Sequence, residues 1–555
     1  MPDRPGSRFP GQPARFSRMG TLLTLLTMFG WVPLTVGLFL VMPPKRAVLW
    51  AFFLSWLFLP MAKYELPMLP DFTKMTAACY GVLLGVVLFD TGRLMQFRPS
   101  FWDIPIFTLT IVAPIASSIS NGLHQVIIYD PLSSALGLFT AWALPYFAGR
   151  LYFKTLDDMK TLGIALVFAG FAYIPIILFE TRFSPQLHRW IYGFHQHDFV
   201  HAARQGGFRP RGFMQSGLMV SLWMGACTVT LFCMWLGGVK LSLMKFRVPM
   251  GVMFFVMLAT TVLCKGVGAL ALTMLALGAI LLSFLVRTRI FVIAMIVIAP
   301  LYVSMRLSGA VTGESLVTFV EQIDEERASS LKFRLDNENL LMVKALTRGV
   351  LGWGGWGRNY VYNELGKRVA VVDGMWILLL GRNGAVGLIA WMLALAVPTL
   401  LFMWRFPPGM WLTPSLAPLT GMATVLAMYQ LDCLPNGMEN PVFFLLAGAM
   451  TSYLSSTEAL EWRRLRGLNG PRTGAGAGTV PAHPPGGPAE PQPVGTPDAT
   501  GERPAAAPLP PGLEPAYAAA GGGRLAPQAR AAVSLVDRSR FAVEGEGDVE
   551  GGSAR

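Results

Sequence analysis

The sequence predicts an all-α protein that crosses a membrane many times, and three observations lead to this fold class. Of the 555 residues, 53% are hydrophobic and only 14% are charged, whereas a soluble chain carries about a quarter charged residues. Apolar runs of about 17 to 24 residues recur along the chain, the length that crosses a bilayer core. Basic residues fall in every second connection between these runs. We therefore expect membrane lipids as neighbours and no nucleic-acid partner.

A polar N-terminal segment, residues 1–19, precedes a membrane domain that we expect to cover residues 20–466. Twelve apolar runs are predicted to span the membrane, at residues 46–62, 73–89, 103–119, 131–149, 161–179, 213–236, 248–264, 267–285, 288–306, 375–403, 413–431 and 441–455. Gly20–Met42 is long enough to add another span, or it only dips into the membrane if Pro33 marks a bend. We expect twelve or thirteen spans.

The basic connections define the expected orientation. They carry Lys45, Arg46, Arg93, Arg98, Arg150, Lys154, Lys160, Lys240, Lys245, Arg247, Arg287, Arg289, Arg405, Arg463, Arg464 and Arg466. By the positive-inside rule these connections are cytoplasmic. Two long polar segments, residues 180–212 and 307–372, then face outward together. Residues 467–555 consist mainly of Ala, Pro and Gly, which cannot build a core, so a disordered cytoplasmic tail is predicted.

Five cysteines lie within or beside the apolar runs, without the spacing of a zinc site, and we expect them to pack as small hydrophobic residues.

The first outer segment contains an unusual excess of arginine. Arg209 and Arg211 stand at the start of the apolar run 213–236, on either side of Pro210, which stiffens the chain. Guanidinium groups bind phosphate oxygens through paired hydrogen bonds and stay charged when partly desolvated. We therefore predict that Arg209 and Arg211 bind an anionic ligand. Snorkelling toward lipid headgroups is the alternative, and we prefer it for Arg182 and Arg189.

Four histidines lie in the same segment: His188, His195, His197 and His201. Their order could offer nitrogen ligands to zinc, but the spacing fits no established metal site. We expect no metal and no cofactor. A histidine that accepts a proton or donates a hydrogen bond to a sugar is the better alternative.

The second outer segment balances eight basic residues against eight acidic ones, so the arrangement of the charges matters more than their sum. Arg327 and Arg334 are seven residues apart, on one face of a predicted helix, and Glu338 lies one turn further. Glu338 either forms a surface ion pair with Arg334, which contributes little, or orients Arg334 toward an anion. Both interpretations stay open.

Five glycines between Gly349 and Gly357 prevent a stable helix and allow a close backbone approach. Trp353, within this stretch, either stacks on a sugar ring or anchors the loop in the interfacial belt. Asp373 stands at the outer boundary of the next span, where an ionised group is costly unless it is paired or used. Lys265 occupies the outer end of two spans joined almost without a loop. Asp373 and Lys265 are candidates for one shared pocket.

The order of these features resembles the O-antigen ligase and polymerase superfamily. The resemblance covers roughly residues 200–400 and is carried by Arg209 to Gly212, Lys265-Gly266, Arg327 with Arg334, Gly352-Trp353-Gly354, and Asp373 ahead of Gly384-Ala-Val-Gly-Leu388. Each motif alone is weak, and the order makes the resemblance more specific.

The resemblance implies a GT-C-like glycosyltransferase in the bacterial inner membrane. Such an enzyme takes a glycan from an undecaprenyl-pyrophosphate carrier on the periplasmic side and passes it to a glycan or lipid acceptor without a metal. By position, Arg211, Lys265 and Arg334 would hold the pyrophosphate, with the other cations beside them. Members usually carry a histidine where Asp373 stands. Asp373 would then be the base that activates the acceptor, provided that burial raises its pKa.

Other functions stay open. The chain could be a non-enzymatic transporter of an anionic lipid or glycan, a class that often shows broken helices bearing charge at mid-membrane. The spans here are poor in charge and the polar residues gather at one face, which favours surface chemistry. A scaffold that recruits partners through the tail is a third hypothesis. The sequence does not separate ligase from polymerase.

Overall fold

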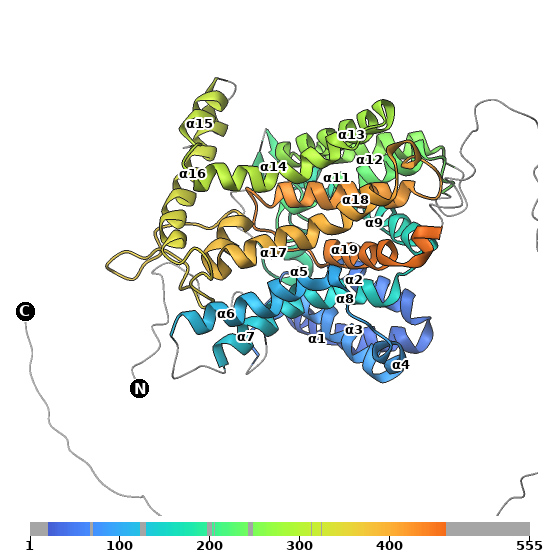
Figure 1. Ribbon diagram of the computed structural model, residues 1–555, viewed down its shortest axis with the longest axis horizontal. Coiled ribbons are helices and arrows are strands. Elements are labelled where there is room, and N and C mark those ends of the chain that lie inside the picture. The colour runs from blue at the N-terminus through green and yellow to red at the C-terminus, as the bar shows by residue number, and fades with distance from the viewer. Residues whose placement is uncertain are drawn as a thin grey trace, which may run out of the picture. The chain divides into compact units, whose positions relative to one another are not determined.

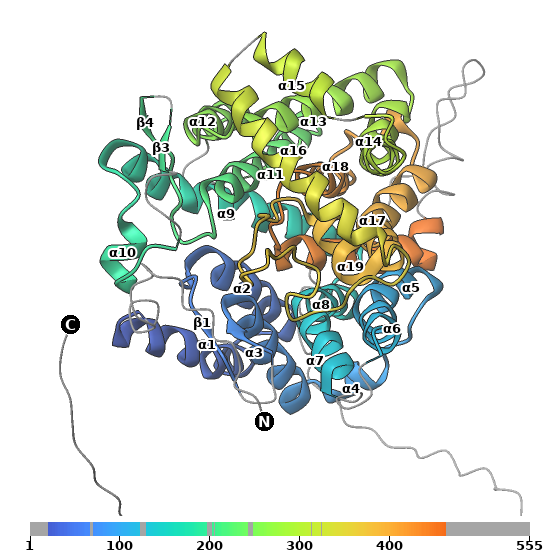
Figure 2. The ribbon, with the colours of Figure 1, turned by 90° about the vertical axis from the view of Figure 1, so that its left-hand side faces the viewer.

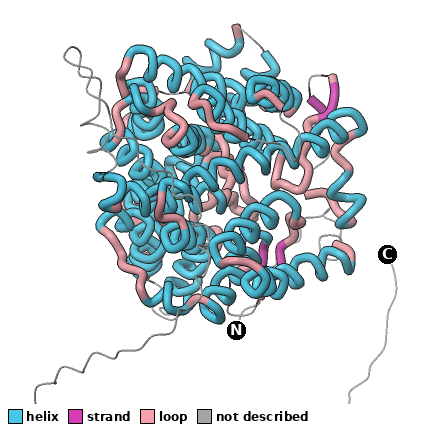
Figure 3. The backbone as a smooth tube through the Cα atoms, turned by 90° about the vertical axis from the view of Figure 1, so that its right-hand side faces the viewer, coloured by secondary structure: helices cyan, strands magenta, loops and turns pink. Residues whose placement is uncertain are grey.

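The computed structural model describes residues 20–66, 70–122, 129–196, 202–204, 206–241, 248–311, 313–322 and 325–461. These residues form helices almost throughout, and their strands are confined to two small antiparallel pairs (Figure 3). The prediction of an all-α fold is confirmed. The predicted segment 1–19 and the predicted tail 467–555 lie outside the described residues.

The first half of the chain contains α1 (Leu22–Val41), α2 (Pro44–Phe58), β1 (Lys63–Tyr64), β2 (Phe72–Thr73), α3 (Lys74–Phe89), α4 (Thr91–Met95), the 3-10 helix η2 (Phe101–Asp103), α5 (Ile104–Phe107), the π-helix η3 (Thr108–Val112), α6 (Ala113–Ser120), α7 (Tyr129–Leu138), the π-helix η4 (Phe139–Ala143), α8 (Leu144–Tyr152), α9 (Leu156–Phe183) and α10 (Leu187–Tyr192). The Gly20–Met42 run forms the single continuous helix α1, with Pro33 inside it. The alternative prediction, that a bend at Pro33 interrupts this run, is therefore wrong.

The second half contains β3 (Ala203–Arg204), β4 (Gly207–Phe208), α11 (Gly217–Leu236), α12 (Met250–Leu263), α13 (Val267–Val286), α14 (Ile290–Leu307), α15 (Glu314–Glu321), α16 (Glu325–Leu346), α17 (Met375–Arg405), the 3-10 helix η6 (Pro408–Met410), α18 (Ala417–Asp432) and α19 (Pro441–Ser455). Arg327, Arg334 and Glu338 all lie on α16, as their spacing predicted. The side chain of Arg327 is outside the described part.

Seven helices in the described part are long and apolar enough to cross a membrane, namely α1, η2 through α6, α9, α11, α13, α14 and α17. The predicted run 213–236 becomes α11, which is 89% buried and packs against α9, α12, α13 and α18. By contrast α1 is 28% buried and lies at the periphery. The five cysteines are free and buried, as small hydrophobic residues are expected to be. The total of twelve or thirteen spans stays a prediction.

Successive long helices run in opposite directions, so the connections gather at two ends of the bundle (Figure 1). We call "the site end" the one where the connections after α2, α9, α12, α14 and α18 lie. Figure 2 looks onto it and shows α10, β3, β4, α15 and α16 together. Contacts join these connections to one another, such as the hydrogen bond from the Met375 nitrogen to the Cys433 oxygen (2.9 Å). The opposite end carries α4 and the described basic residues between the helices, such as Arg93, Lys154 and Arg287, and we call it "the basic end".

Candidate functional site

The segment around Arg211 is fixed to α9 by a buried carboxylate. Glu180 Oε2 accepts hydrogen bonds from the backbone nitrogens of Arg211 and Gly212, both at 2.7 Å. Gly212 has φ +53°, and a side chain there would collide with the Tyr173 hydroxyl. Arg211 is only 3% exposed, and its charge acts on the nearby Glu180. Arg211 is therefore more deeply buried than a surface cation, with a carboxylate as its electrostatic partner.

Arg209 and Lys265 lie in contact at the site end. The shared pocket expected for Lys265 and Asp373 stays a prediction, because the ion-pair partner of Asp373 is Arg334. The Arg209 guanidinium donates a hydrogen bond from Nη2 to the Lys265 carbonyl oxygen at 2.8 Å. Lys265 sits in the turn between α12 and α13 with φ +52°, a strained backbone conformation for a residue with a side chain. Its ammonium lies so close to Gly207, in β4, that a Cβ there would collide with it. Both cationic side chains are half-buried at the site end.

A second group of charges gathers around Arg334, where α16 meets α17 and α18. Arg334 Nε lies 3.8 Å from Asp373 Oδ2, and both side chains keep about a third of their surface exposed (35% and 34%). Asp373 is thus neither deeply buried nor alone. The condition of burial, on which its role as a base depended, is not met.

Asp432 is the carboxylate that does meet this condition, and sequence reasoning missed it. It ends α18, is 3% exposed, and accepts a hydrogen bond from Asn436 Nδ2 to Oδ1 at 3.2 Å. Its other oxygen, Oδ2, has no hydrogen-bond partner within the described ranges. Burial raises the pKa of Asp432 to about 7, although Asn436 and the charge of Arg334 act to lower it. A buried carboxylate with a free oxygen and a pKa near neutrality is suited to accept a proton.

The expected relation between Glu338 and Arg334 is wrong. Glu338 is 7% exposed and forms a buried ion pair with Arg306 at the end of α14, with Oε2 3.5 Å from Arg306 Nη2. Its two oxygens also accept hydrogen bonds from Trp376 Nε1 (3.1 Å) and the Tyr302 hydroxyl (3.2 Å). Burial raises the pKa of Glu338. Helical spacing does place Glu338 and Arg334 on one side of α16, but packing on α14 and α17 turns the carboxylate inward.

The glycine-rich loop after α16 forms hydrogen bonds with the backbone of α17 at a break in that helix. Within α17, Gly384 has φ +66° and ψ −168°, a conformation that only glycine adopts readily. Such a break leaves backbone groups without partners in the helix. The loop supplies them through three hydrogen bonds of 2.8 Å, from Trp353 N to Gly381 O, from Gly354 N to Arg382 O, and from Ala385 N to Gly349 O. The glycines thus allow the backbones of the loop and of α17 to approach each other closely, which is one of the roles expected from the sequence.

Trp353 is half-buried and engaged with α16. Its Nε1 donates to the Lys344 carbonyl oxygen at 2.9 Å, and its ring receives the cations of Arg348 (4.6 Å) and Lys344 (5.1 Å). By contrast Trp356 is 66% exposed and stacks loosely on Tyr129. These contacts favour loop anchoring for Trp353 and leave Trp356 as the more accessible ring. Stacking of Trp353 on a sugar stays a prediction.

A third charged group, also missed, surrounds the break in α17. Arg358 Nη2 pairs with Asp130 Oδ2 at 2.8 Å, and its Nε donates to the Trp353 carbonyl oxygen. Arg382 is half-buried within reach of the charges of Asp130, Arg358 and Glu439. Arg382, inside an apolar run, is the signal that could have revealed this group, because charges inside such runs are costly.

The four histidines of the first polar segment lie partly within the described residues and partly outside them. His188 is buried; its Nε2 accepts a hydrogen bond from the Met61 nitrogen (3.1 Å) and its Nδ1 faces the Phe194 carbonyl oxygen (2.8 Å). Burial lowers the pKa of His188 to about 4, so it is neutral and structural. His197 and His201 lie outside the described residues.

Four of the predicted residues therefore lie in two local pairs at the site end: Arg209 with Lys265, and Arg334 with Asp373. Ser216 Oγ, at the start of α11, lies 3.1 Å from Met438 Sδ in the connection after α18, and so joins the neighbourhoods of the two groups. Asp432 could have been found by the reasoning applied to Asp373, since it too stands where an apolar run meets a polar connection. A comparison of the chain with models of known protein families gives no match, and a search among curated proteins finds none.

Proposed function

We propose that the chain is a membrane glycosyltransferase of the O-antigen ligase and polymerase type. It would transfer or polymerise a glycan carried by undecaprenyl pyrophosphate, with another glycan or a lipid as acceptor. The reaction would take place at the site end, on the periplasmic face of the inner membrane, with the tail in the cytoplasm. The single observation that carries this proposal is that cations and carboxylates from distant connections gather at one end of an apolar bundle.

In this proposal the cations bind the pyrophosphate of the glycan donor. Arg209 and Lys265 lie side by side and are half-buried, so their charges act in an environment less screened than water. In the proposed reaction the bond between the sugar carbon and the pyrophosphate oxygen breaks, and the oxygen keeps the electron pair. Fixed cations directed at that oxygen stabilise the developing charge. Arg211 holds the segment in place next to Glu180 and adds to the positive potential.

In this proposal a carboxylate activates the hydroxyl group of the acceptor. A base takes the proton from the acceptor hydroxyl while its oxygen attacks the sugar carbon, so one glycosidic bond forms as one phosphoester bond breaks. Asp373 is the base expected from the resemblance, and Asp432 is the carboxylate with the buried setting and the unused oxygen. We propose Asp432 as the base, with Asp373 holding Arg334 in position.

The test compares charge-removing variants in cells that make the glycan. Arg211→Ala and Lys265→Met should stop surface glycan and leave carrier-linked glycan accumulating, while the protein still inserts. Arg189→Gln is the matched control, because Arg189 is an exposed cation at the same end. A loss of one site cation should reduce transfer about 100-fold, as for other preorganised transition-state contacts. Normal surface glycan in the Lys265→Met strain would refute the proposal.

One observation favours a transporter as the second candidate. α17 is broken at Gly384, with Arg382 and Asn383 beside the break, and broken helices with charge are typical of transporters. The backbone of the loop from Gly349 to Gly354, however, already forms hydrogen bonds with the backbone groups at the break, so these groups are not left to a substrate. Purified protein in sealed vesicles separates the two functions: a transporter moves the carrier-linked glycan unchanged, whereas a transferase forms a new glycosidic bond.

A further inference from the structure

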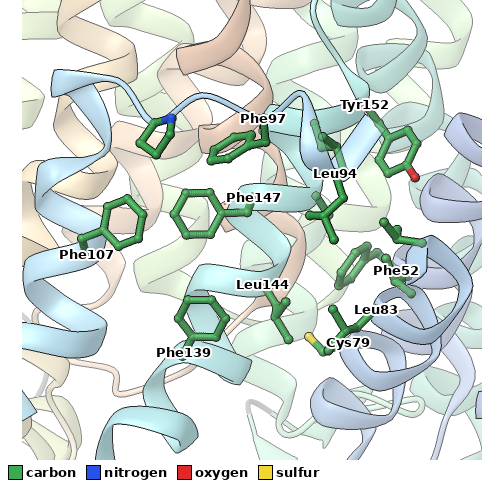
Figure 4. Close-up of a pocket in the computed structure, with 15 residues that line it drawn as sticks. Phe52, Cys79, Leu83, Leu94, Phe97, Phe107, Phe139, Leu144, Phe147 and Tyr152 are labelled. Carbon is green, nitrogen blue, oxygen red and sulfur yellow. The ribbon is translucent and has the colours of Figure 1, made fainter. Parts of the chain in front are cut away.

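An apolar cavity of about 350 Å³ lies between α2, α3, α4, α5, η4 and α8, far along the chain from the site residues. Figure 4 shows aromatic rings directed into it from several elements, among them Phe52, Phe97, Phe107 and Phe147. The volume lies within the range of about 300–1,000 Å³ that is typical of ligand pockets. Its walls offer almost no polar group, so any occupant presents hydrocarbon to them.

The cavity opens through the exposed surface of the bundle. Two residues of its wall, Leu83 on α3 and Leu94 on α4, are 41% and 40% exposed. Leu84, Val87 and Leu88 continue this exposed apolar surface along α3. In a bilayer such a surface faces lipid tails. A void there forfeits dispersion contacts on one side, so a neighbouring acyl chain fills it.

Filling by a hydrocarbon chain does not by itself select a lipid, because all lipid tails are about equally apolar. Selection has to come from the mouth of the cavity, and that mouth is basic. Arg93 lies over the ring of Tyr152, a wall residue, at 5.0 Å. Arg98 stands between the wall residues Phe97 and Pro99 in the sequence, and its side chain is exposed.

Lys154 adds a third cation, two residues after Tyr152. Partial burial lowers the pKa of Lys154, and so do the like charges of Arg93 and Arg150. Asp90 offsets one charge through its ion pair with Arg93 (Oδ2 to Nε, 3.1 Å). Asp103 pairs with Arg150 in the same way (2.8 Å), so Arg98 and Lys154, both exposed, are the cations whose repulsion a bound anion would relieve.

We propose that this cavity holds an acyl chain of an anionic phospholipid whose phosphate headgroup is bound by Arg93, Arg98 and Lys154. The site lies at the basic end, separate from the proposed glycan chemistry at the site end. Basic pockets between membrane helices are known to bind anionic headgroups. The role is that of a structural lipid, which fills a hollow in the wall and fixes α3, α4 and α8 relative to one another.

Native mass spectrometry of the full chain in detergent tests this proposal. Phosphatidylglycerol and phosphatidylethanolamine with identical chains are titrated, because the two differ in net charge and not in tail. We expect preferential retention of phosphatidylglycerol. The double variant Arg98→Gln with Lys154→Gln should weaken its binding about 25-fold, or about fivefold for each cation, which corresponds to about 1 kcal/mol per residue.

A matched double variant, Lys160→Gln with Arg287→Gln, removes one exposed cation from α9 and one from the turn after α13, neither of which lines the cavity, and should leave the binding unchanged. Leu83→Trp, or Leu94→Trp if the first fails to fold, should fill the opening and displace both lipids. Equal retention of the two lipids by the unmodified chain would overturn the proposal. Undecaprenyl phosphate that binds in the cavity while phosphatidylglycerol does not would overturn it as well.

Discussion

Gly352 and Gly384 lie back to back, and a Cβ on Gly352 would come within 2.5 Å of the Gly384 nitrogen. Both residues have positive φ, +73° and +66°. The loop backbone thereby reaches the break in α17 and takes over its hydrogen bonds. The contact joins the loop that follows α16 to the apolar helix α17, so it helps to fix α16 relative to α17.

Gly384→Ala should therefore destabilise the protein strongly. The backbone conformation alone costs about 1–3 kcal/mol for a residue with a side chain, and the new methyl group would collide with the Val350 carbonyl. Gly278→Ala is the control, because Gly278 lies in α13 with open space around its position and alanine favours a helix. Thermal unfolding in detergent should show a clear loss for the first variant only; equal midpoints would mean that the break is dispensable.

The buried pair of Arg306 and Glu338 leads to a second prediction. Arg306→Met should leave the Glu338 carboxylate buried without its counter-charge and lower the free energy of unfolding by about 3–5 kcal/mol. Arg334→Met should cost far less stability, because Arg334 is partly exposed. Denaturant titrations of the two variants check this ranking. If they turn out to be equally stable, the assignment of Glu338 to Arg306 is contradicted.

Sequence reasoning found what local spacing determines and missed what tertiary packing determines. The apolar runs, the helix that bears Arg334, and the absence of a helix from Gly349 to Gly357 all follow from periodicity and backbone freedom. The partner of Glu338 did not follow, because Arg306 is more than thirty residues away in sequence. The position of Asp432 at the end of an apolar run could be read from the sequence, whereas its burial and the nearby charge of Arg334 could not.

The pKa of Asp432, about 7, implies a pH dependence of transfer. A base works in its ionised form, so the rate should rise with pH up to about 7 and then level off. Asp432→Asn should abolish this rise together with most of the activity. Asp373→Asn should lower the activity yet leave the midpoint near 7. A midpoint near 7 that persists in Asp432→Asn would assign the titration to another group.

The same carboxylate should affect stability in the opposite direction. The folded protein holds the Asp432 proton to higher pH than the unfolded chain does, so this group's contribution to the free energy of unfolding falls as the pH rises from about 4 toward 7. Asp432→Asn should remove that decline. Unfolding midpoints measured across this pH range separate the effect from catalysis, and an unchanged pH profile in the variant would contradict burial of the carboxylate.

The two loop tryptophans should behave differently. Trp353→Phe removes one hydrogen bond, to the Lys344 oxygen, and should cost about 1 kcal/mol of stability. Trp356→Ala removes an exposed ring and should leave stability nearly unchanged while raising KM for the glycan if that ring stacks on sugar. Kinetics and unfolding of both variants test the division. A change in KM for Trp353→Phe alone would reverse the assignment.

The most direct measurement uses purified protein with undecaprenyl-pyrophosphate-linked glycan and an acceptor glycan, and follows the release of undecaprenyl pyrophosphate together with the elongated product. The account predicts equal amounts of both, and a loss of about 100-fold in kcat/KM for Lys265→Met with Arg189→Gln unaffected. Release and elongation that proceed at the normal rate in Lys265→Met, or a donor that crosses the membrane without any new glycosidic bond, would contradict it.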